Sequence, residues 1–347
     1  MANLVITDQC NLACPYCFAQ SYLQQEKAEG NPTGVFISRE AFEARLDFLV
    51  RSGVGEVRLI GGEPTLHPQF EALIAAAQQR GLKVIVFSHG VMKDSALRCL
   101  EQLPLDQCTV LINANASHPT ADSERLMVRR QTALLRLGER ALPGCNLYTS
   151  NIKLDWLIPL IMETGCRKAV RLGLAQPIVG ADNLYLHPKQ YRIIAEKIVR
   201  FAERAAEHGI RVEFDCGFVR CMFSDKELAT LHRLDADIGW RCSPVLDIAM
   251  NDTAIHCFPL TNFATVVFDA TTDDAAGLRT ALAQQVAPYR QAGIYKECSS
   301  CAYKAAGECS GGCLGVTVRR FREGAIRVRV PAPFTAYVAQ EAIETSE

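Results

Sequence analysis

The sequence carries almost no net charge, because 37 lysines and arginines oppose 38 aspartates and glutamates. It therefore lacks the basic surplus that is typical of proteins binding nucleic acid or an anionic membrane surface. No stretch approaches the roughly 20 consecutive apolar residues that a membrane-spanning helix needs. The opening residues, MANLVITDQCN, contain no basic segment followed by an apolar run, so we expect no signal peptide. We expect a cytoplasmic protein with no nucleic-acid or membrane partner.

Cysteine, by contrast, is abundant, with 15 among 347 residues. Disulfides are rare in the cytoplasm, where thiols are kept reduced, so clustered cysteines there more often hold metal. Four cysteines lie singly in apolar or helical contexts, and we expect them to be small buried hydrophobic side chains: Cys99, Cys108, Cys145 and Cys166. The others form an N-terminal trio and a C-terminal group, so both regions are candidates for metal binding.

The first 220 residues alternate short β-rich runs with amphipathic helical stretches. The pattern predicts strands over 3–7, 56–60, 83–90, 109–116, 146–152 and 169–178, and helices over 39–52, 70–81, 95–103, 123–141 and 154–165. Six β/α units in series predict parallel strands with crossover helices, hence an α/β sheet or a partial (β/α)6 TIM-like barrel. The loops that follow the strands should then converge on one cleft.

The pattern changes after a long helix predicted over 190–209 and a β-rich run over 211–219. Residues 246–258 look like a β-hairpin that turns at Asn251-Asp252, because such residues tolerate the left-handed backbone of tight turns. A helix is expected from about Ala275 to Gln291, followed by the cysteine-dense stretch 297–315. We expect two domains, 1–220 and 221–347, the second a small cysteine-rich α+β domain held by metal.

The stretch CNLACPYC, residues 10–17, spaces Cys10, Cys14 and Cys17 as C-x3-C-x2-C. Three thiolates cannot saturate a tetrahedral zinc ion, and no histidine lies nearby to be the fourth ligand. They do suit a 4Fe–4S cluster in which one iron is left for an outside ligand. Close cysteine trios also occur in zinc sites, so the trio needs further support.

That support comes from GGEPT after the second predicted strand and from Tyr16, the aromatic residue just before the last cysteine of the trio. Together these features resemble the radical S-adenosylmethionine (SAM) enzymes over about residues 1–220. The resemblance implies that the open iron binds SAM and that an electron from the cluster cleaves it to methionine and a 5′-deoxyadenosyl radical, which abstracts hydrogen from a substrate. It also implies an electron donor such as flavodoxin or ferredoxin.

The resemblance further implies SAM contacts at the strand ends. The backbone of Gly61 and Gly62 and the carboxylate of Glu63 are expected to receive the SAM ammonium group. Ser88 and His89 stand where the family often has threonine and asparagine, so the role of His89 is open. The other expected contacts are Asn113, Asn115, Ser150 and Asn151 toward the ribose, and Arg171 and Gln176 near the adenine. The structural alternatives are a turn for the two glycines, a solvated charge for Glu63 and an ordinary loop histidine for His89. The asparagines and Ser150 can be polar caps, and Arg171 can pair with a carboxylate from a neighbouring helix.

The C-terminal cysteines form a second pattern. Cys242 and Cys257 flank the expected hairpin, and 298–313 reads C-x2-C-x7-C-x3-C. This resembles the SPASM extension of radical SAM proteins, which holds auxiliary iron–sulfur clusters, although Asp252 stands where that family usually has glycine. The resemblance implies one cluster on Cys242, Cys257 and Cys313, with Cys216 or Cys221 as the fourth ligand. A second cluster would be held by Cys298, Cys301 and Cys309 and completed by the leftover one of Cys216 and Cys221 or by a non-cysteine ligand, so one or two auxiliary clusters are expected. A structural zinc at Cys298, Cys301, Cys309 and Cys313 is the alternative.

We expect an enzyme that modifies a peptide or protein side chain by crosslinking, oxidation or epimerisation, because SPASM-like extensions are common in peptide maturases. Asp215, beside Cys216, is a candidate catalytic base. The predicted barrel begins at residue 3, which leaves no N-terminal peptide-recognition domain, so a small-molecule substrate is the alternative. A metal-holding scaffold that never cleaves SAM is the alternative of another class. The basic run VTVRRFREGAIRVRV is expected to form an edge strand.

Overall fold

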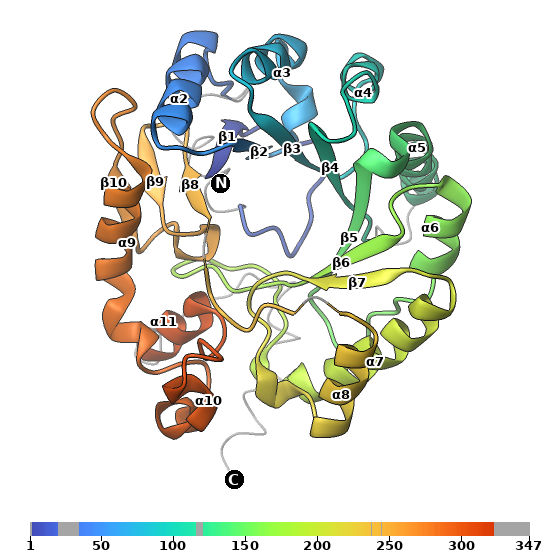
Figure 1. Cartoon of the computed structure of the whole chain (residues 1–347), viewed down its shortest axis with the longest axis vertical. Helices are drawn as coiled ribbons and strands as arrows, with labels where there is room; N and C mark the ends of the chain where they lie inside the picture. The colour runs from blue at the N-terminus through green and yellow to red at the C-terminus, as the bar shows by residue number, and fades with distance from the viewer. Residues whose placement is uncertain (1, 20–34, 116–120, 237, 244, 323–347) are drawn as a thin grey trace.

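The computed structural model describes residues 2–19, 35–115, 121–236, 238–243 and 245–322. Its strands form one ten-stranded sheet, in the order β10-β9-β8-β1-β2-β3-β4-β5-β6-β7 (Figure 1). The strands are β1 (Ala2–Thr7), β2 (Glu56–Gly61), β3 (Lys83–Ser88), β4 (Cys108–Asn113), β5 (Ala141–Leu147), β6 (Ala169–Leu174), β7 (Arg211–Phe214), β8 (Leu246–Ile248), β9 (Thr253–Ile255) and β10 (Thr265–Val267). Strands β1 to β7 pair in parallel throughout, so their carboxyl ends lie at one edge.

A helix follows each of β1 to β6, and these helices lie outside the curved sheet (Figure 1). The helices are α2 (Arg39–Arg51), α3 (Phe70–Gln79), α4 (Asp94–Glu101), α5 (Ala121–Leu137), α6 (Leu157–Thr164), α7 (Tyr191–Glu207), α8 (Asp225–Arg233), α9 (Ala275–Arg290), α10 (Ala302–Ala305) and α11 (Leu314–Arg322). The partial TIM-like barrel predicted from the β/α alternation is therefore confirmed. Among the described helices, none is long and apolar enough to span a membrane.

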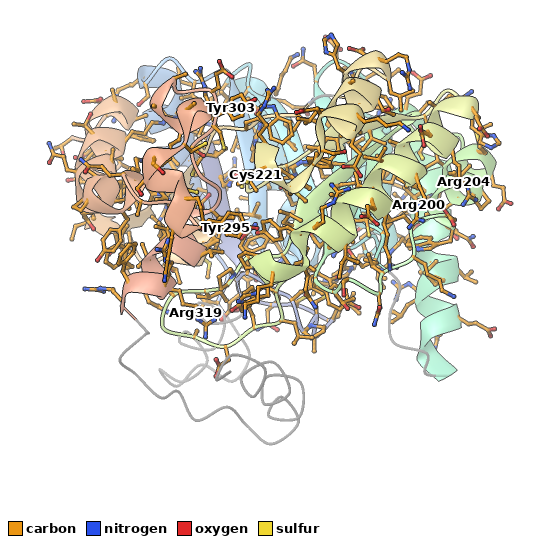
Figure 2. The ribbon with its side chains drawn as sticks, turned by 90° about the horizontal axis from the view of Figure 1, so that it is seen from below. Arg200, Arg204, Cys221, Tyr295, Tyr303 and Arg319 are labelled. Carbon is orange, nitrogen blue, oxygen red and sulfur yellow. The ribbon has the colours of Figure 1, made fainter. Side chains whose placement is uncertain are left out.

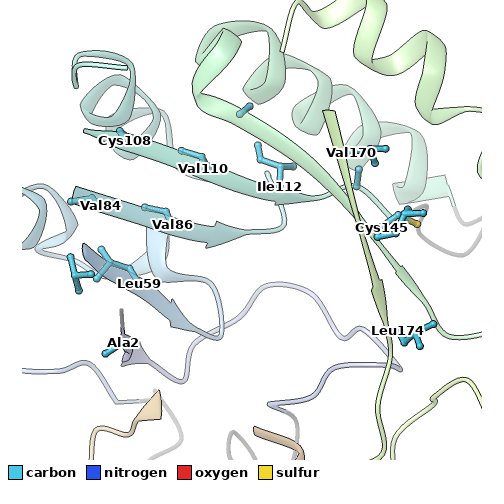
Figure 3. Close-up of a cluster of buried hydrophobic side chains, with 14 of the residues drawn as sticks. Ala2, Leu59, Val84, Val86, Cys108, Val110, Ile112, Cys145, Val170 and Leu174 are labelled. Atoms are coloured by element: carbon cyan, nitrogen blue, oxygen red, sulfur yellow. The ribbon is translucent and has the colours of Figure 1, made fainter. Parts of the chain in front are cut away.

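The barrel core consists of apolar strand residues that pack against their neighbours on adjacent strands (Figure 3). Leu59 of β2, Val86 of β3 and Val110 of β4 are fully buried in one cluster. Three of the four isolated cysteines, Cys108, Cys145 and Cys166, are buried in the same cluster, and Cys99 packs against it half-buried. The expectation of small buried hydrophobic side chains is confirmed for these three, whereas Cys99 is only partly buried.

Strand β5 differs from its prediction. The expected strand at 146–152 is wrong, because the strand occupies Ala141–Leu147. Pro143 and Gly144 resemble a turn in the sequence, yet the Gly144 carbonyl oxygen accepts the ladder hydrogen bond from Ala114 N–H at 2.7 Å. The ladder to β4 therefore continues across a proline that has no N–H of its own.

The edge strand expected in VTVRRFREGAIRVRV is also wrong over its described part, because residues 314–322 form helix α11. Leu314 and Val318, one turn apart, pack in a small apolar cluster with Leu260 and Val286. Arginines occupy the last turn, where cations offset the helix dipole. Burial on one helical face thus overrides the β propensity of the valines. Residues 323–330 of this run lie outside the described residues.

The predicted hairpin is confirmed, and it extends the barrel sheet. Strands β8 and β9 pair antiparallel, and Asp252 in their turn has the left-handed φ of 54°. Strand β8 also pairs in parallel with β1, where Leu4 lies opposite Ile248, and Asn3 donates a hydrogen bond to the Asp247 carboxyl. The hairpin thus joins the first strand of the chain; the domain boundary near residue 220 stays a prediction.

Arg45 of α2 holds the turn of this hairpin. Its Nη2 donates to the carbonyl oxygens of Ala249 (3.1 Å) and Met250 (3.0 Å) and to the Asp252 carboxylate (2.8 Å), and the side chain is 2% exposed. We expect Arg45→Met to lower the free energy of unfolding by about 3 kcal/mol, because the carbonyls lose their donor. Urea denaturation measures this change.

The matched control is Arg39→Met on the same helix, where the exposed guanidinium pairs with Glu43. We expect that variant to stay within about 1 kcal/mol of the unmutated protein. An equal effect of both substitutions would contradict a stabilising role for Arg45.

Candidate active site

A cavity of ≈ 190 Å³ opens at the carboxyl edge of strands β2 to β6, where the strand-end loops meet. Its lining includes ten residues predicted for the SAM and cluster site and the predicted base: Cys10, Cys14, Tyr16, Cys17, Gly61, Gly62, Ser88, His89, Asn113, Arg171 and Asp215. Glu63, Asn115, Ser150, Asn151 and Gln176 do not line it. The sequence thus identified the walls of this cavity better than the residues behind them.

The cysteine trio follows directly on β1. A turn closed by the Cys17 N–H and the Cys14 carbonyl oxygen (3.1 Å) brings the last two cysteines together, and all three are half-buried. Burial raises the pKa of Cys14, whereas a hydrogen bond with the Tyr16 side chain and the positive charge of Arg130 lower it. The buried cation thus offsets only part of the effect of burial on this thiol.

In the described part of the chain, no three histidine, cysteine or acidic side chains converge closely enough to hold one metal ion. Around a single zinc ion, each thiolate sulfur would lie about 2.3 Å from the metal. In a 4Fe–4S cluster each thiolate binds its own iron, which keeps the sulfurs farther apart. The three thiols of the trio fit a cluster with one open iron, one thiolate for each of the other three irons.

Gly61 and Gly62 let the end of β2 press against the segment that leads into the trio. A Cβ atom on Gly61 would lie 2.2 Å from the Thr7 carbonyl oxygen, and one on Gly62 would lie 2.1 Å from that of Gln9. The Gly62 N–H donates a hydrogen bond to the Thr7 carbonyl oxygen at 2.8 Å. The two glycines therefore have a structural requirement of their own, and they also expose backbone to the cavity.

Glu63 lies fully buried behind the cavity wall. Its Oε1 accepts hydrogen bonds from the Thr65 N–H (3.3 Å) and hydroxyl (2.6 Å), and its Oε2 accepts from the Ser88 hydroxyl (3.0 Å) and the His89 N–H (3.0 Å). The carboxylate thus ties the end of β2 to the end of β3. A contact with the SAM ammonium stays a prediction.

His89 joins the β3 loop to the trio loop. Its Nδ1 accepts from the Val91 N–H (3.0 Å), which leaves the ring proton on Nε2 to donate to Asn11 Oδ1 (2.7 Å). Burial lowers the pKa of His89, so the neutral ring is favoured. The buried Arg130 donates to the His89 carbonyl oxygen (3.0 Å). Sequence reasoning missed Asn11 and Arg130, for which no motif existed.

Tyr16 is held by a stack and a hydrogen bond. Its ring stacks on Tyr148 with centroids 4.7 Å apart, and its hydroxyl accepts from Asn113 Nδ2 at 2.9 Å. Asn115 stands one step behind, where its amide exchanges hydrogen bonds with the backbone of Asn146. Asn115 thus braces the ends of β4 and β5 rather than lining the cavity.

Arg171 and Asp215 also line the cavity and form an ion pair. Arg171 Nη2 lies 2.6 Å from Asp215 Oδ1, and its guanidinium lies 5.7 Å from the centre of the Phe87 ring. Arg171 therefore forms an ion pair, but with a carboxylate that follows strand β7 rather than with one from a neighbouring helix. Gly173 leaves room here, because a Cβ would lie 3.0 Å from Asn146 Oδ1 and 3.6 Å from Asp215 Oδ2.

Several cavity residues have no counterpart in the sequence reasoning. Gly144, Cys145 and Asn146 line the cavity because β5 ends there, whereas Ser150 and Asn151 fall in the turn beyond it. Placing β5 too late shifted the expected contacts along the chain. Alternation along β6, with Arg171 and Gly173 both facing the cavity, was the available signal for its far wall.

The C-terminal cysteines fall into two groups of four. The first cysteine group is Cys216, Cys242, Cys257 and Cys313, and the second cysteine group is Cys221, Cys298, Cys301 and Cys309. In the first cysteine group, burial raises the pKa of Cys257 well above that of a free thiol, and the charges of Cys313, Cys242 and Cys216 raise it further. In the second cysteine group, burial raises the pKa of Cys221 to about 11, helped by Cys298, Cys309 and Cys301. Mutual effects of this kind require short separations. Cys216 thus lies with the hairpin pair and Cys221 with the later cysteines.

Local packing supports both groups. Gly217, beside Cys216, approaches Cys313 so closely that a Cβ would lie 3.9 Å from the Cys313 Cβ. In the second group, the Gly311 N–H lies 3.4 Å from Cys309 Sγ, and a Cβ on Gly293 would lie 2.8 Å from Cys298 Sγ. Cys221 lies beside Tyr295 between the C-terminal helices and the barrel (Figure 2).

Comparison with known proteins finds a sequence relative for about a third of the chain and solved structures that cover nine tenths of it or more. The chain is 34% identical over 113 residues to GTP 3′,8-cyclase from Synechocystis sp., which is 32% of this chain and 33% of that protein. The first curated relatives are thus matched over about a third of their length or less.

Two solved structures share the fold. The structure described as native anSMEcpe with bound AdoMet is 17% identical, with a TM-score of 0.64, covering 99% of this chain and 98% of that one. SuiB of Streptococcus suis, bound to precursor peptide SuiA, is 16% identical, with a TM-score of 0.63, covering 90% and 71%. Residues 4–153, the region that carries the cysteine trio and GGEPT, match the family model of the Radical SAM superfamily.

Proposed function

We propose that the chain is an enzyme that reductively cleaves SAM and abstracts hydrogen from a peptide or protein side chain. The observation that carries the proposal is the cavity, whose lining includes both the cysteine trio and the Arg171–Asp215 pair. A cluster bound by the trio would supply the electron that cleaves SAM to methionine and a 5′-deoxyadenosyl radical. The chain's own residues orient SAM and substrate between these walls and exclude water.

We further propose two auxiliary clusters, one in each cysteine group. Each group supplies four thiols, the number that a fully ligated 4Fe–4S cluster takes. Cys313 lies with Cys216, Cys242 and Cys257 rather than with Cys298, Cys301 and Cys309. This grouping favours two clusters over a zinc ion on Cys298, Cys301, Cys309 and Cys313, and it uses both Cys216 and Cys221.

A peptide substrate is favoured by the fold that this chain shares with SuiB, which was solved with a precursor peptide. The cavity suits a side chain entering between two walls, because Gly144 and Gly173 leave space beside the Arg171–Asp215 pair. Crosslinking, oxidation and epimerisation all begin with the same hydrogen abstraction. The 34% identity to a GTP 3′,8-cyclase favours a small nucleotide as the second candidate.

The test uses anaerobic protein reduced with dithionite and given SAM. The proposal expects 5′-deoxyadenosine and methionine in equal amounts, and transfer of deuterium into 5′-deoxyadenosine from a pool of side-chain-deuterated peptides. Deuterium transfer from deuterated GTP and not from the peptides would favour the nucleotide candidate. No SAM cleavage with full iron content would contradict the enzyme and favour a metal-holding scaffold.

Asp215 is proposed as the base that takes a proton from the substrate. Its Oδ1 is occupied by Arg171 and by the Cys216 N–H (2.7 Å), while Oδ2 faces the space beside Gly173. We expect Asp215→Asn to keep the rate of SAM cleavage within about twofold and to lower product formation by about 100-fold. Chromatography of 5′-deoxyadenosine and mass spectrometry of the product measure the two rates. A parallel fall of both rates would contradict a role confined to the substrate.

A further inference from the structure

Three buried polar atoms lie close to the first cysteine group without a partner. The Gln176 side chain is 6% exposed and Tyr191 is 1% exposed. No described residue forms a hydrogen bond of normal geometry with Gln176 Oε1, Gln176 Nε2 or the Tyr191 hydroxyl. The Gln176 amide is nevertheless near enough to Tyr191 to lower the pKa of that hydroxyl, against the larger effect of burial. Burying a hydrogen-bond donor without an acceptor costs folding free energy, so we expect these two side chains to bind an acceptor in the assembled protein.

The pair lies against the loops that carry the cysteines. Gly217 has the left-handed φ of 98°, and a Cβ there would lie 2.4 Å from Gln176 Nε2. Gly315 approaches Pro177 so closely that its Cβ would lie 2.9 Å from the Pro177 carbonyl oxygen and 3.5 Å from Cys313 Sγ. Tyr191 and Cys313 are buried in the same cluster of side chains. Both side chains therefore border the volume that the four thiols surround.

The same volume receives other donors. The thiol of Cys313 accepts hydrogen bonds from the backbone of Gly315 and Val316, and that of Cys242 from Leu314, all in the first turn of α11. A helix N-terminus favours negative charge, and a cluster with four thiolate ligands carries it. Asn183 fixes the loop, because its side chain donates to the Gln176 carbonyl oxygen (2.9 Å) and accepts from the Ile178 N–H (3.0 Å), so the Gln176 backbone is held in place.

We propose that the Gln176 amide and the Tyr191 hydroxyl donate hydrogen bonds to sulfur atoms of an iron–sulfur cluster held by Cys216, Cys242, Cys257 and Cys313. The inference rests on the proposed auxiliary cluster. It moves Gln176 from the adenine contact expected from sequence to the auxiliary site. Donors to cluster sulfurs stabilise the reduced, more negative form, so they raise the reduction potential. Both side chains are positioning residues that set this potential.

The test uses the full chain with Cys10, Cys14 and Cys17 all changed to Ala, so that auxiliary clusters alone contribute. Redox titration followed by electron paramagnetic resonance gives the midpoint potentials, and the signal lost in Cys242→Ala identifies the first cysteine group. We expect Tyr191→Phe and Gln176→Leu each to keep the iron content and to shift that midpoint to more negative values. The double variant should shift it further.

Tyr295→Phe is the matched control, because the Tyr295 hydroxyl already donates to the Pro188 carbonyl oxygen at 2.8 Å and the residue lies by the second cysteine group. We expect it to leave the first-group midpoint unchanged. An unchanged midpoint in both Tyr191→Phe and Gln176→Leu, with iron retained, would overturn the inference alone. An unchanged iron content in Cys242→Ala would contradict the proposed auxiliary cluster, and the inference that rests on it.

Discussion

Changing Cys10, Cys14 and Cys17 together to Ala should abolish SAM cleavage and remove about four of about twelve irons. The three thiols are half-buried at the cavity, and each would bind one iron of the proposed cluster. Without them no iron is open to SAM at this site. The eight cysteines of the two C-terminal groups are unchanged, so about eight irons should stay. Iron and sulfide analysis and 5′-deoxyadenosine chromatography on anaerobic protein measure both effects.

Cys99→Ala is the matched control for this experiment. Cys99 is half-buried, packs against the barrel core and belongs to none of the proposed cluster sites. It should keep full iron content and full SAM cleavage. About eight irons falling to about four in the triple variant would instead mean a single auxiliary cluster. Zinc in place of iron in the unmutated protein would contradict the radical mechanism itself.

Glu63→Gln should lower the free energy of unfolding by about 3 kcal/mol and weaken SAM binding at least tenfold. Four donors, from Thr65, Ser88 and His89, point at the two carboxylate oxygens, and the side chain is fully buried. A glutamine presents an NH2 group to one hydroxyl and one backbone N–H; the hydroxyl can turn to accept, but the backbone N–H loses its acceptor. Because Ser88 and His89 line the cavity, their displacement should disturb the SAM site as well.

Glu56→Gln, at the other end of the same strand, is the control, because that carboxylate accepts a bond from the partly exposed Arg58. Its effect should stay within about 1 kcal/mol. Denaturant unfolding and anaerobic calorimetry with SAM separate the two consequences of the Glu63 change. Weakened SAM binding with unchanged stability would mean that the carboxylate contacts SAM directly, against the bracing role that the four donors indicate.

The sequence predicted the barrel because repeated β/α units leave few other topologies, and it predicted the cavity walls because parallel strands end at one edge. The predictions from sequence were wrong for two elements whose local sequence favours another structure. Pro143-Gly144 resembles a turn, yet β5 runs through it. The valines of 316–318 favour a strand, yet they belong to α11.

The other failures concern contacts between distant segments. Arg45 is buried against a turn about 205 residues away, and nothing in its own surroundings in the chain marks it. Gln176 could be placed at a strand end but not beside Tyr191 and Cys313, because that contact depends on how the 176–178 loop packs onto α11. The choice between Cys216 and Cys221 for each cluster also depends on packing, since the spacing permits both.

The pairing of β8 with β1 makes the order of folding unusual. Ala2 lies opposite Leu246, so one edge of the first strand stays unpaired until about 245 further residues have been synthesised. At roughly 5–20 residues per second, translation leaves that edge open for roughly 10–50 s. An open strand edge is a template for aggregation, and contacts so far apart in sequence form slowly. The nascent barrel is therefore most exposed to misfolding before the segment with the auxiliary cysteines emerges, and shielding of β1 by a chaperone during that interval should raise the yield of folded protein.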